Sequence, residues 1–462
     1  VDLLQRRGLF GTMDYPHSVA TTWSLSFEQL EHADSTAADL LRLCAFLHPD
    51  AIPEEMLVAR AASLGPRLQR ITDDPIHLDA AIGTLRRFSL IRRNAEEKTL
   101  TIHRLVQMVL RDSMDAETER EWAERTVLAV SYAFPADAFT AWHQRERYLP
   151  HALACVDLIE RWDMRFSEAV RLLNHVGNQL YEHGQYKEAE SLCLHALVIR
   201  EQLLGCDHPE VAQSLNDLAV IYIALNKHEQ VEALCLRALS IQEHTLGPDH
   251  QDIAVTLNDL AMLYYLQGRY EQIEPLYQRA LSIFESRLGP THPYMAVALN
   301  NLGKLYAAQG KFAQAELLMQ QVLTMREQVL GHEHPDIANS LHNLAKLYAA
   351  QGKYAEAESL YRRALMIREQ CLGPTHRDLA STLYDLARLL LTLHDSEAAE
   401  PFYRRAVTIY EQVWGPEHPD LVYLVEEYAG LMHKVEREDE AVPLKEYFIV
   451  PSSLHQSQSP AQ

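Results

Sequence analysis

The chain has 462 residues, of which 47% are hydrophobic and 23% are charged, as expected for an ordered protein of two or three domains. Its formal net charge of −22 argues against nucleic-acid binding by the chain as a whole, because contacts with phosphates need a basic surface. The six cysteines form no CxxC pair, which favours a reducing, cytoplasmic compartment. No apolar run approaches the roughly 20 residues of a membrane span, and no signal peptide is recognisable. Because the first residue is Val1, we expect a fragment of a longer protein.

Residues 1–115 form the first segment with its own pattern. Helical periodicity predicts helices over 18–30, 35–57 and 77–90, with Ser35 as the N-cap of the second. The stretches "SLIRR" and "LTIHR", separated by "NAEEKT", are typical of a β-hairpin, and "LVQMVLRDSM" is typical of a helix after it. This order predicts a winged-helix-like module. Its basic residues between positions 81 and 111 leave two interpretations open, which are DNA binding and packing against protein alone.

Residues 116–167 are helical in pattern and rich in aromatic residues, but they lie outside the repeat register that follows. We expect a helical connector that caps the first repeat, because the end of a repeat array exposes an apolar face. Trp122, Trp142 and Trp162 are expected to pack in this connector rather than to belong to a binding site.

A glycine that ends a helical run recurs every 42 residues, and a histidine follows each glycine at a constant offset. The glycines are Gly205, Gly247, Gly289, Gly331, Gly373 and Gly415, and the histidines are His208, His250, His292, His334, His376 and His418. Two amphipathic segments alternate between the glycines, which predicts a helical solenoid. We expect six full units and a weaker seventh over 168–447. A disordered tail is expected over 448–462, where apolar residues are too few to pack.

The histidines in register raise the question of a metal site. Zinc ligands lie about 2.0–2.1 Å from their ion, whereas equivalent residues of stacked repeats are at least about 8–10 Å apart. We therefore expect the histidines to serve the turns between repeats, and no metal ion. Cys193 and Cys235 share a repeat position that tyrosine or methionine fills elsewhere, which indicates packing rather than redox chemistry.

The pattern L-[GA]-x-x-Y…G-x-[YF]…A resembles the tetratricopeptide repeat, and the 42-residue period with "LNNLG" and "LGPTHP" resembles its kinesin light chain subtype. Small residues stand where paired helices must approach closely, at Ala219, Ala261, Gly303, Ala345 and Ala387. The resemblance implies an all-α fold with a right-handed superhelix, preceded here by the winged-helix-like module. It also implies an interaction scaffold whose first helices line a concave groove.

Three rows of side chains on the first helices are the candidate groove residues. The first row is mostly asparagine, the second holds aspartate or asparagine, and the third carries cations in its last three repeats. The candidate residues are Asn216, Asn258, Asn300, Asn301, Asn343, Lys304, Lys346 and Arg388. By resemblance, the carboxamides would bind the backbone of an extended peptide, since an amide both donates and accepts hydrogen bonds. The cations would form a strip suited to an acidic, carboxylate-bearing ligand. The alternative is an ordinary solvated surface, because an exposed concave face must be polar in any case.

Residues 1–115 also resemble the segment after the nucleotide-binding core in NB-ARC (STAND-type) signal-transduction ATPases with tetratricopeptide repeats. The resemblance rests on "LLQRRG", "SVATTWSLSFEQL", "LLRLCAFLHPDAIPEE" and "IHRLVQMVLRD". In that family a hydrophobic–His–Asp triplet senses ADP, and its histidine touches the β-phosphate. Ile102, His103 and Arg104 occupy the corresponding place. Only His103 is carried over as a nucleotide-sensing residue, because Arg104 replaces the aspartate. The alternative is a buried histidine that begins a helix.

The motifs of nucleotide and hydrolase chemistry are missing from these 462 residues, since we find no GxxxxGK[ST], GxSxG or HExxH. We therefore expect no catalysis and no cofactor in this chain, with ADP or ATP bound only in a longer parent. The sequence predicts a cytoplasmic scaffold or sensor arm that binds a protein or peptide and, in a parent, its own upstream ATPase domain. We expect neither membrane nor nucleic acid as a partner. The alternatives are a winged-helix DNA-binding regulator with ligand-sensing repeats, and a stand-alone adaptor.

Overall fold

The computed structural model describes residues 19–59, 64–73, 75–135, 141–414, 421, 424–426 and 429–430. His418, most of the predicted seventh repeat and the predicted tail at 448–462 lie outside these residues. The chain divides into two compact units, residues 1–226 and 227–462. Helices dominate both units, as the sequence pattern predicts.

The N-terminal part of the first unit combines helices with a small sheet. Its elements are α2 (Val19–Ala33), α3 (Ser35–Cys44), β1 (Ile52–Pro53), α4 (Glu54–Val58), α5 (Pro66–Asp73), α6 (Pro75–Arg87), β2 (Ile91–Asn94), β3 (Thr99–Ile102) and α7 (Arg104–Asp112). The sheet is antiparallel in the order β1-β3-β2, with Ile91 paired to Ile102 and Ile52 paired to Leu100. The predicted hairpin is confirmed, and β1 is a third strand that the sequence did not reveal. The winged-helix assignment stays a prediction.

The single helix predicted over 35–57 is wrong, because α3 ends at Cys44 and the chain then forms β1 and the short α4. Pro49 and Pro53 lack the amide hydrogens that a continuous helix needs, which explains the break. The N-cap of α3 is Asp34 rather than Ser35. The Asp34 carboxylate accepts hydrogen bonds from the amides of Thr36 and Ala37, each at 3.0 Å.

Two long helices, α8 (Ala116–Ala133) and α9 (Trp142–Trp162), lead into the repeats. They pack against each other, and both contact α10 of the first repeat. Trp122 is buried, with the guanidinium of Arg125 at 4.6 Å from its ring centroid. The packing role expected for Trp122 is confirmed, and the boundaries of the connector remain predictions.

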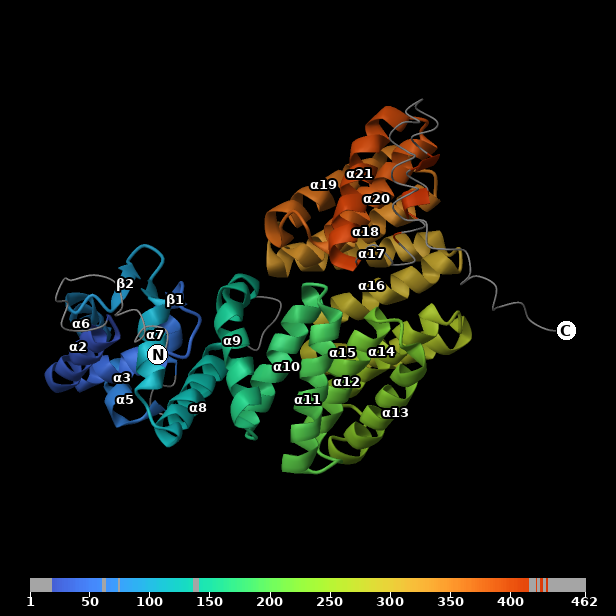
Figure 1. Ribbon diagram of the computed structural model, residues 1–462. Coiled ribbons are helices and arrows are strands. Elements are labelled where there is room, and N and C mark those ends of the chain that lie inside the picture. The colour runs from blue at the N-terminus through green and yellow to red at the C-terminus, as the bar shows by residue number, and fades with distance from the viewer. Residues whose placement is uncertain are drawn as a thin grey trace, which may run out of the picture. The chain divides into compact units, whose positions relative to one another are not determined.

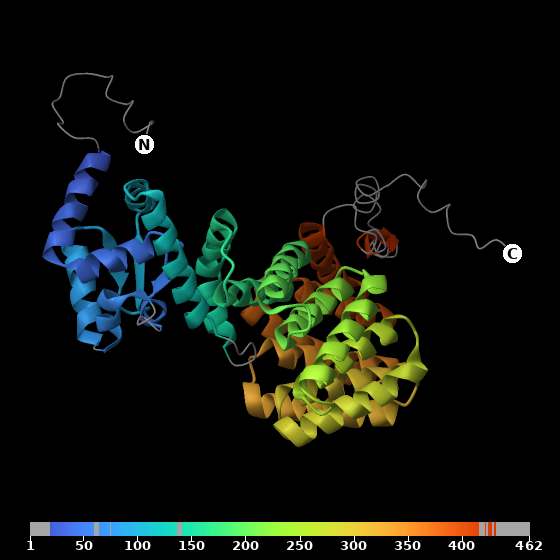
Figure 2. The ribbon, with the colours of Figure 1, turned by 90° about the horizontal axis from the view of Figure 1, so that it is seen from below.

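Helix pairs then repeat through the rest of the described chain, as predicted (Figure 1, Figure 2). The first unit ends with α10 (Ser167–Glu182), α11 (Tyr186–Leu204) and α12 (Pro209–Ala224). The second unit holds α13 (His228–Thr245), α14 (Gln251–Leu266), η2 (Tyr270–Gln272), α15 (Ile273–Leu288), α16 (Pro293–Ala308), α17 (Phe312–Leu330), α18 (Pro335–Ala350), α19 (Tyr354–Leu372), α20 (Arg377–Thr392) and α21 (Ser396–Trp414). Each second helix from α15 to α19 also contacts the first helix of the next pair.

Small residues allow the paired helices to approach closely, as the sequence predicts. Ala261, Ala345 and Ala387 are fully buried in their first helices. At the equivalent Gly303, an added Cβ would stand 3.2 Å from Cγ of Met319 on α17. Alanine at positions 261, 345 and 387 and glycine at position 303 therefore match the local width of the gap between the paired helices.

Histidines cap the first helices of the repeats. Nδ1 accepts a hydrogen bond from the amide two residues later, at 3.1–3.3 Å, in His208, His250, His292, His334 and His376. The imidazole thus acts as an N-cap acceptor for an amide that the helix itself leaves unpaired. The turn role predicted for these histidines is confirmed for the five that the structure describes.

Candidate functional site

The predicted groove residues lie on the first helices of the repeats, and these helices contact one another. In the second unit α14 contacts α16, α16 contacts α18, and α18 contacts α20. In the first unit α10 contacts α12 (Figure 1). Equivalent residues of neighbouring first helices therefore stand close to each other. The three predicted rows form one surface within each unit.

The asparagines of the first two rows bond to each other between repeats. Nδ2 of Asn301 donates to Oδ1 of Asn258 at 3.1 Å, and Nδ2 of Asn343 donates to Oδ1 of Asn300 at 3.1 Å. Asn216, Asn258, Asn300 and Asn301 are all buried. The carboxamides therefore serve first to join neighbouring helices, which the sequence analysis missed. The signal was a pair of polar residues 43 positions apart, one repeat plus one residue.

The next pair in this ladder joins an imidazole to a carboxylate by a hydrogen bond, and burial lowers the pKa of His342. Nε2 of His342 lies 3.2 Å from Oδ2 of Asp385, and Nζ of Lys346 lies 3.6 Å from the same oxygen. Burial raises the pKa of Asp385, but the hydrogen bond from His342 and the positive charges of Lys346 and Arg388 outweigh it, so the pKa is lowered overall. Lys346 thus compensates an acidic group of the protein itself, while part of its side chain remains exposed.

Lys304 differs from Lys346 in its surroundings. Asn343 takes the place that Asp385 takes opposite Lys346, so no carboxylate compensates the Lys304 ammonium. Among the residues that the structure describes, Lys304 has no hydrogen-bond or ion-pair partner. Burial and the nearby charges of Arg326 and Lys346 lower its pKa to about 8. A half-buried cation without an anion is therefore present on this surface.

Arg388, the last cation of the third row, is exposed on α20. Its guanidinium carbon lies 5.4 Å from the centroid of the Tyr384 ring on the same helix. The structure places Lys304, Lys346 and Arg388 on successive first helices, as the spacing predicts.

Buried arginines join three of the second helices, α11, α17 and α19, to the next first helix, and they were not predicted from the sequence. Arg326 donates to the carbonyl of Asp336 at 2.9 Å and to Oγ of Ser340 at 2.8 Å. Arg200 and Arg368 make the same pair of contacts with residues 10 and 14 positions later. The sequence does contain a signal for these contacts. Each arginine is followed 14 residues later by a serine or threonine, which lies in the second turn of the next first helix.

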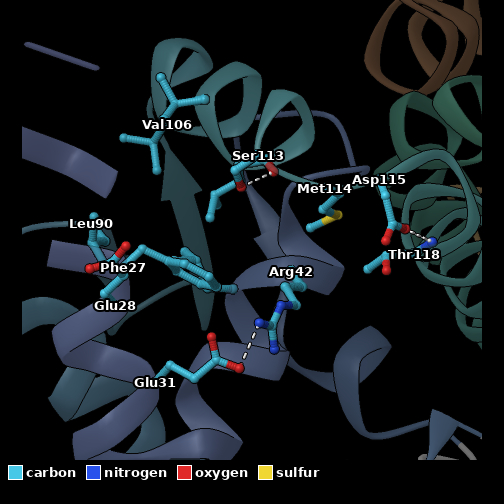
Figure 3. Close-up of a pocket in the computed structure, with 13 residues that line it drawn as sticks. Phe27, Glu28, Glu31, Arg42, Leu90, Val106, Ser113, Met114, Asp115 and Thr118 are labelled. Carbon is cyan, nitrogen blue, oxygen red and sulfur yellow. Dashed lines mark hydrogen bonds and ion pairs between the residues drawn. The ribbon is translucent and has the colours of Figure 1, made fainter. Parts of the chain in front are cut away.

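A cavity of about 330 Å³ lies in the N-terminal part of the first unit (Figure 3). Phe27, Leu41, Val106 and other apolar side chains from α2, α3 and α7 line it, and the start of α8 closes one side. Arg42 reaches its wall, donating to Glu31 at 2.8 Å with its guanidinium 4.9 Å from the Phe27 ring centroid. The cavity lining is mixed, with polar and apolar side chains in similar shares, and its one arginine is already paired.

His103 begins α7 and lines a second cavity, of about 440 Å³. Its Nδ1 accepts from the amide of Leu105 at 3.2 Å, which is the same cap that the repeat histidines make. His103 is exposed, and Arg92 and Arg104 line the cavity with it. The helix-capping alternative is thus confirmed as a structural role, although the residue is not buried. A nucleotide-sensing role is neither required nor opposed by this contact.

None of the helices in the described part of the chain combines the length and the apolar character that a membrane span needs. Across the same ranges, no group of three or more histidine, cysteine or acidic side chains is arranged to hold a metal ion.

Comparisons with known proteins identify both parts of the chain. The tetratricopeptide repeat family matches residues 168–243, 227–286, 252–328, 318–370 and 336–412, which together exceed half of the chain. A domain of unknown function, DUF7779, matches residues 27–119. A nucleotide-binding leucine-rich repeat (NLR)-like protein of Hyaloscypha variabilis is 32% identical over 202 residues, which are 43% of this chain and 19% of that protein. The chain thus spans about a fifth of that relative's length.

Two solved structures represent the two predicted resemblances. The signal transduction ATPase with numerous domains (STAND) from Pyrococcus horikoshii, which carries a tetratricopeptide repeat sensor, is 15% identical with a TM-score of 0.50. That match covers 95% of this chain and 66% of the other. A kinesin light chain of Podosopora anserina with nearly identical TPR-like repeats is 26% identical, with a TM-score of 0.35 over 44% of this chain and 95% of the other. On the strength of the repeats matched along its length, the chain belongs to the tetratricopeptide repeat family.

Proposed function

We propose that the first-helix surface of the second unit binds an acidic protein or peptide segment. Tetratricopeptide repeats indicate a protein-interaction scaffold. The observation that carries the finer proposal is Lys304, which is half-buried and lacks an anionic partner among the described residues. A carboxylate from a ligand would supply the charge that Asp385 supplies to Lys346.

The asparagine pairs play a supporting part in this proposal. Because Asn258 bonds with Asn301 and Asn300 bonds with Asn343, these carboxamides hold the first helices at a constant spacing. An amide oxygen can accept a second hydrogen bond, so a backbone N–H of the ligand can donate to it without breaking the asparagine pairs. Affinity would then come mainly from Lys304 and from the exposed parts of Lys346 and Arg388.

The test is binding of the full chain to an array of capped 12-residue peptides of graded net charge. We expect retention to increase with acidic content and to fall at least tenfold in Lys304→Glu, and further when Lys346→Glu is added. Lys311→Glu is the matched control, because Lys311 is exposed, stacks over Tyr306 and lies outside the three rows. Equal loss in the Lys311 variant, or no loss in the Lys304 variant, would reject a local cationic site.

We further propose that the repeats are the sensor arm of a larger signal-transduction ATPase. The support is the fold shared with a STAND protein that carries a tetratricopeptide repeat sensor, and the similarity to an NLR-like protein. A ligand would regulate such a protein only by binding one of its conformations more tightly than the other. The experiment is to measure nucleotide affinity of the intact parent with and without an acidic peptide that the repeats bind. An unchanged affinity would refute the coupling.

His103 is the residue through which the N-terminal part would respond to nucleotide. Its support is an exposed ring at the wall of a cavity that Arg92 and Arg104 also line. We expect the His103 ring resonances of this chain to shift on addition of ADP but not of adenosine, and the shift to require Arg92. The same region gives less support to DNA binding. Arg93 forms ion pairs with Glu54 at 2.5 Å and with Asp79 at 2.8 Å, so its charge is already compensated within the protein.

A further inference from the structure

A polar cavity of about 410 Å³ lies in the first repeat, between α10, α11 and α12. Asn174, Asn178 and His175 of α10, Arg200 of α11 and Asp217 of α12 are among its lining residues. It belongs to the first unit and contains none of the cations of the proposed acidic-peptide surface. The balance of donors and acceptors that its walls leave unused decides what it can bind.

Asn174 presents an unused acceptor. The residue is only 4% exposed, its Nδ2 donates to Oγ of Ser214 at 3.2 Å, and its Oδ1 is buried without a hydrogen-bond partner. We infer the amide orientation by analogy with later repeats. At the equivalent positions, the hydroxyls of Ser340 and Thr382 donate to the carbonyl four residues earlier, and a Ser214 hydroxyl that does the same accepts from Asn174 and Arg200. Oδ1 of Asn174 is therefore left without a donor, and a buried carbonyl in that state costs free energy.

Asp217 is a second acceptor, and it has no ion pair among the residues that the structure describes. Nδ2 of Asn178 donates a hydrogen bond to its carboxylate at 3.3 Å. Asp385 occupies the equivalent position four repeats later, and there Lys346 stands where Asn178 stands here. The two aspartates therefore differ in pKa. Burial raises the pKa of Asp217 to about 6, whereas the pKa of Asp385 is lowered. The first repeat thus has the carboxylate of the later pair without its ammonium.

The cations that line the cavity offset the charge of that carboxylate only in part, because the lowering of the Asp217 pKa by Arg200 is smaller than the rise caused by burial. One guanidinium nitrogen of Arg200 donates to the carbonyl of Glu210 at 3.1 Å and to Oγ of Ser214, and its Nε lies 3.5 Å from the Glu210 carboxylate. Arg171 donates to the carbonyl oxygen of Ser131 at 3.0 Å and to its hydroxyl. His175 stays neutral near pH 7, because burial and the surrounding arginines lower its pKa to about 4. Besides Oδ1 of Asn174, Nε of Arg200 and Nδ1 of His175 are buried without a hydrogen-bond partner, and the Asp217 carboxylate has no ion pair among the described residues.

We propose that this cavity binds a primary ammonium group of a ligand, held between Oδ1 of Asn174 and the carboxylate of Asp217. The ammonium takes the place that Nζ of Lys346 takes beside Asp385, at 3.6 Å. Its N–H donors satisfy the amide oxygen and the carboxylate together, and its charge offsets the buried acid. The source is either a small free amine or an amino group of a peptide, from lysine or from the chain terminus.

The first test compares the binding of butylammonium and of butyltrimethylammonium to the full chain. Binding is monitored by NMR, through the side-chain amide resonances of Asn174 and Asn178. Both probes carry one positive charge, but only butylammonium has N–H donors. We expect butylammonium to bind at least tenfold more tightly. Equal binding of the two probes would overturn the proposal, because a charge effect alone would then explain it.

Variants test the two acceptors and the geometry. Asp217→Asn keeps the fold, since asparagine stands at the equivalent Asn301 and Asn343, and it should weaken butylammonium binding at least tenfold. Asn178→Lys should also abolish binding, because it supplies the missing ammonium from within the chain, and it should raise the temperature of unfolding. Ser191→Lys, an exposed position on α11 outside the cavity, should change neither quantity. Unchanged binding in either cavity variant refutes the site.

The same assay separates the two sources. Nα-acetyl-lysine methylamide represents a lysine side chain, and glycine methylamide represents a chain terminus. If the natural ligand is a peptide, one of these two compounds should bind more tightly than butylammonium. If neither does, the natural ligand is a small amine. The proposed acidic-peptide surface is unaffected by these results, because none of its residues lines this cavity.

Discussion

Replacing Asp217 with asparagine should remove a pH dependence from the stability of the first repeat. The pKa of Asp217 is raised from 3.8 to about 6 in the folded protein, because desolvation of the carboxyl group outweighs the hydrogen bond from Asn178 and the charge of Arg200. A raised pKa means that folding favours the protonated form. The contribution of this group to stability is therefore fully present below about pH 4 and is lost as the pH rises through 6.

The magnitude follows from the same two pKa values. At about 1.36 kcal/mol per pH unit, moving the pKa from 3.8 to about 6 corresponds to about 3 kcal/mol, which is an upper limit for a side chain that solvent partly reaches. Charged and titratable groups from three helices face this carboxyl group, namely Glu168, Arg171 and His175 of α10, Arg200 of α11 and Glu210 of α12. They are the same in both proteins, so their titration cancels in the difference.

The assay is urea unfolding of the full chain and of Asp217→Asn at pH 4 and pH 7.5. We expect the variant to gain roughly 1–3 kcal/mol relative to the parent between the two pH values. Asp157→Asn, at an exposed position on α9, is the control and should show no such change. A stability difference between parent and variant that is the same at both pH values would refute the reasoning.

The remaining predictions concern the joints between helices. Arg368→Met should cost about 2–4 kcal/mol in urea unfolding, because it leaves the carbonyl of Asp378 and the hydroxyl of Thr382 without their buried donor. His334→Ala should cost about 1 kcal/mol, and His334→Asn should restore most of it, since either side chain can cap α18. Gly177→Ala should cost about 1–3 kcal/mol, because its Cβ would lie 2.6 Å from Sγ of Cys193, and adding Cys193→Ala should recover the loss in thermal unfolding.

Local and periodic features of the fold were predictable from sequence. The 42-residue spacing of glycines and histidines was enough to predict helix pairs, their small-residue contacts and the turn role of His334 and its equivalents. These features depend on residues close in sequence or on a repeat that fixes which residues are equivalent. The helix predicted over 35–57 failed for the opposite reason, because β1 pairs with β3, whose residues lie nearly 50 positions away.

Tertiary structure alone decided which polar side chains satisfy each other. The sequence placed Asn258 and Asn300 on one face but could not show that Asn301 and Asn343 of the next repeats bond to them. It placed Lys304 and Lys346 in one row, yet only Lys346 has a carboxylate beside it. The physical reason is that burial and the charge opposite a group decide its pKa and its need for a ligand, and both depend on how neighbouring repeats are registered.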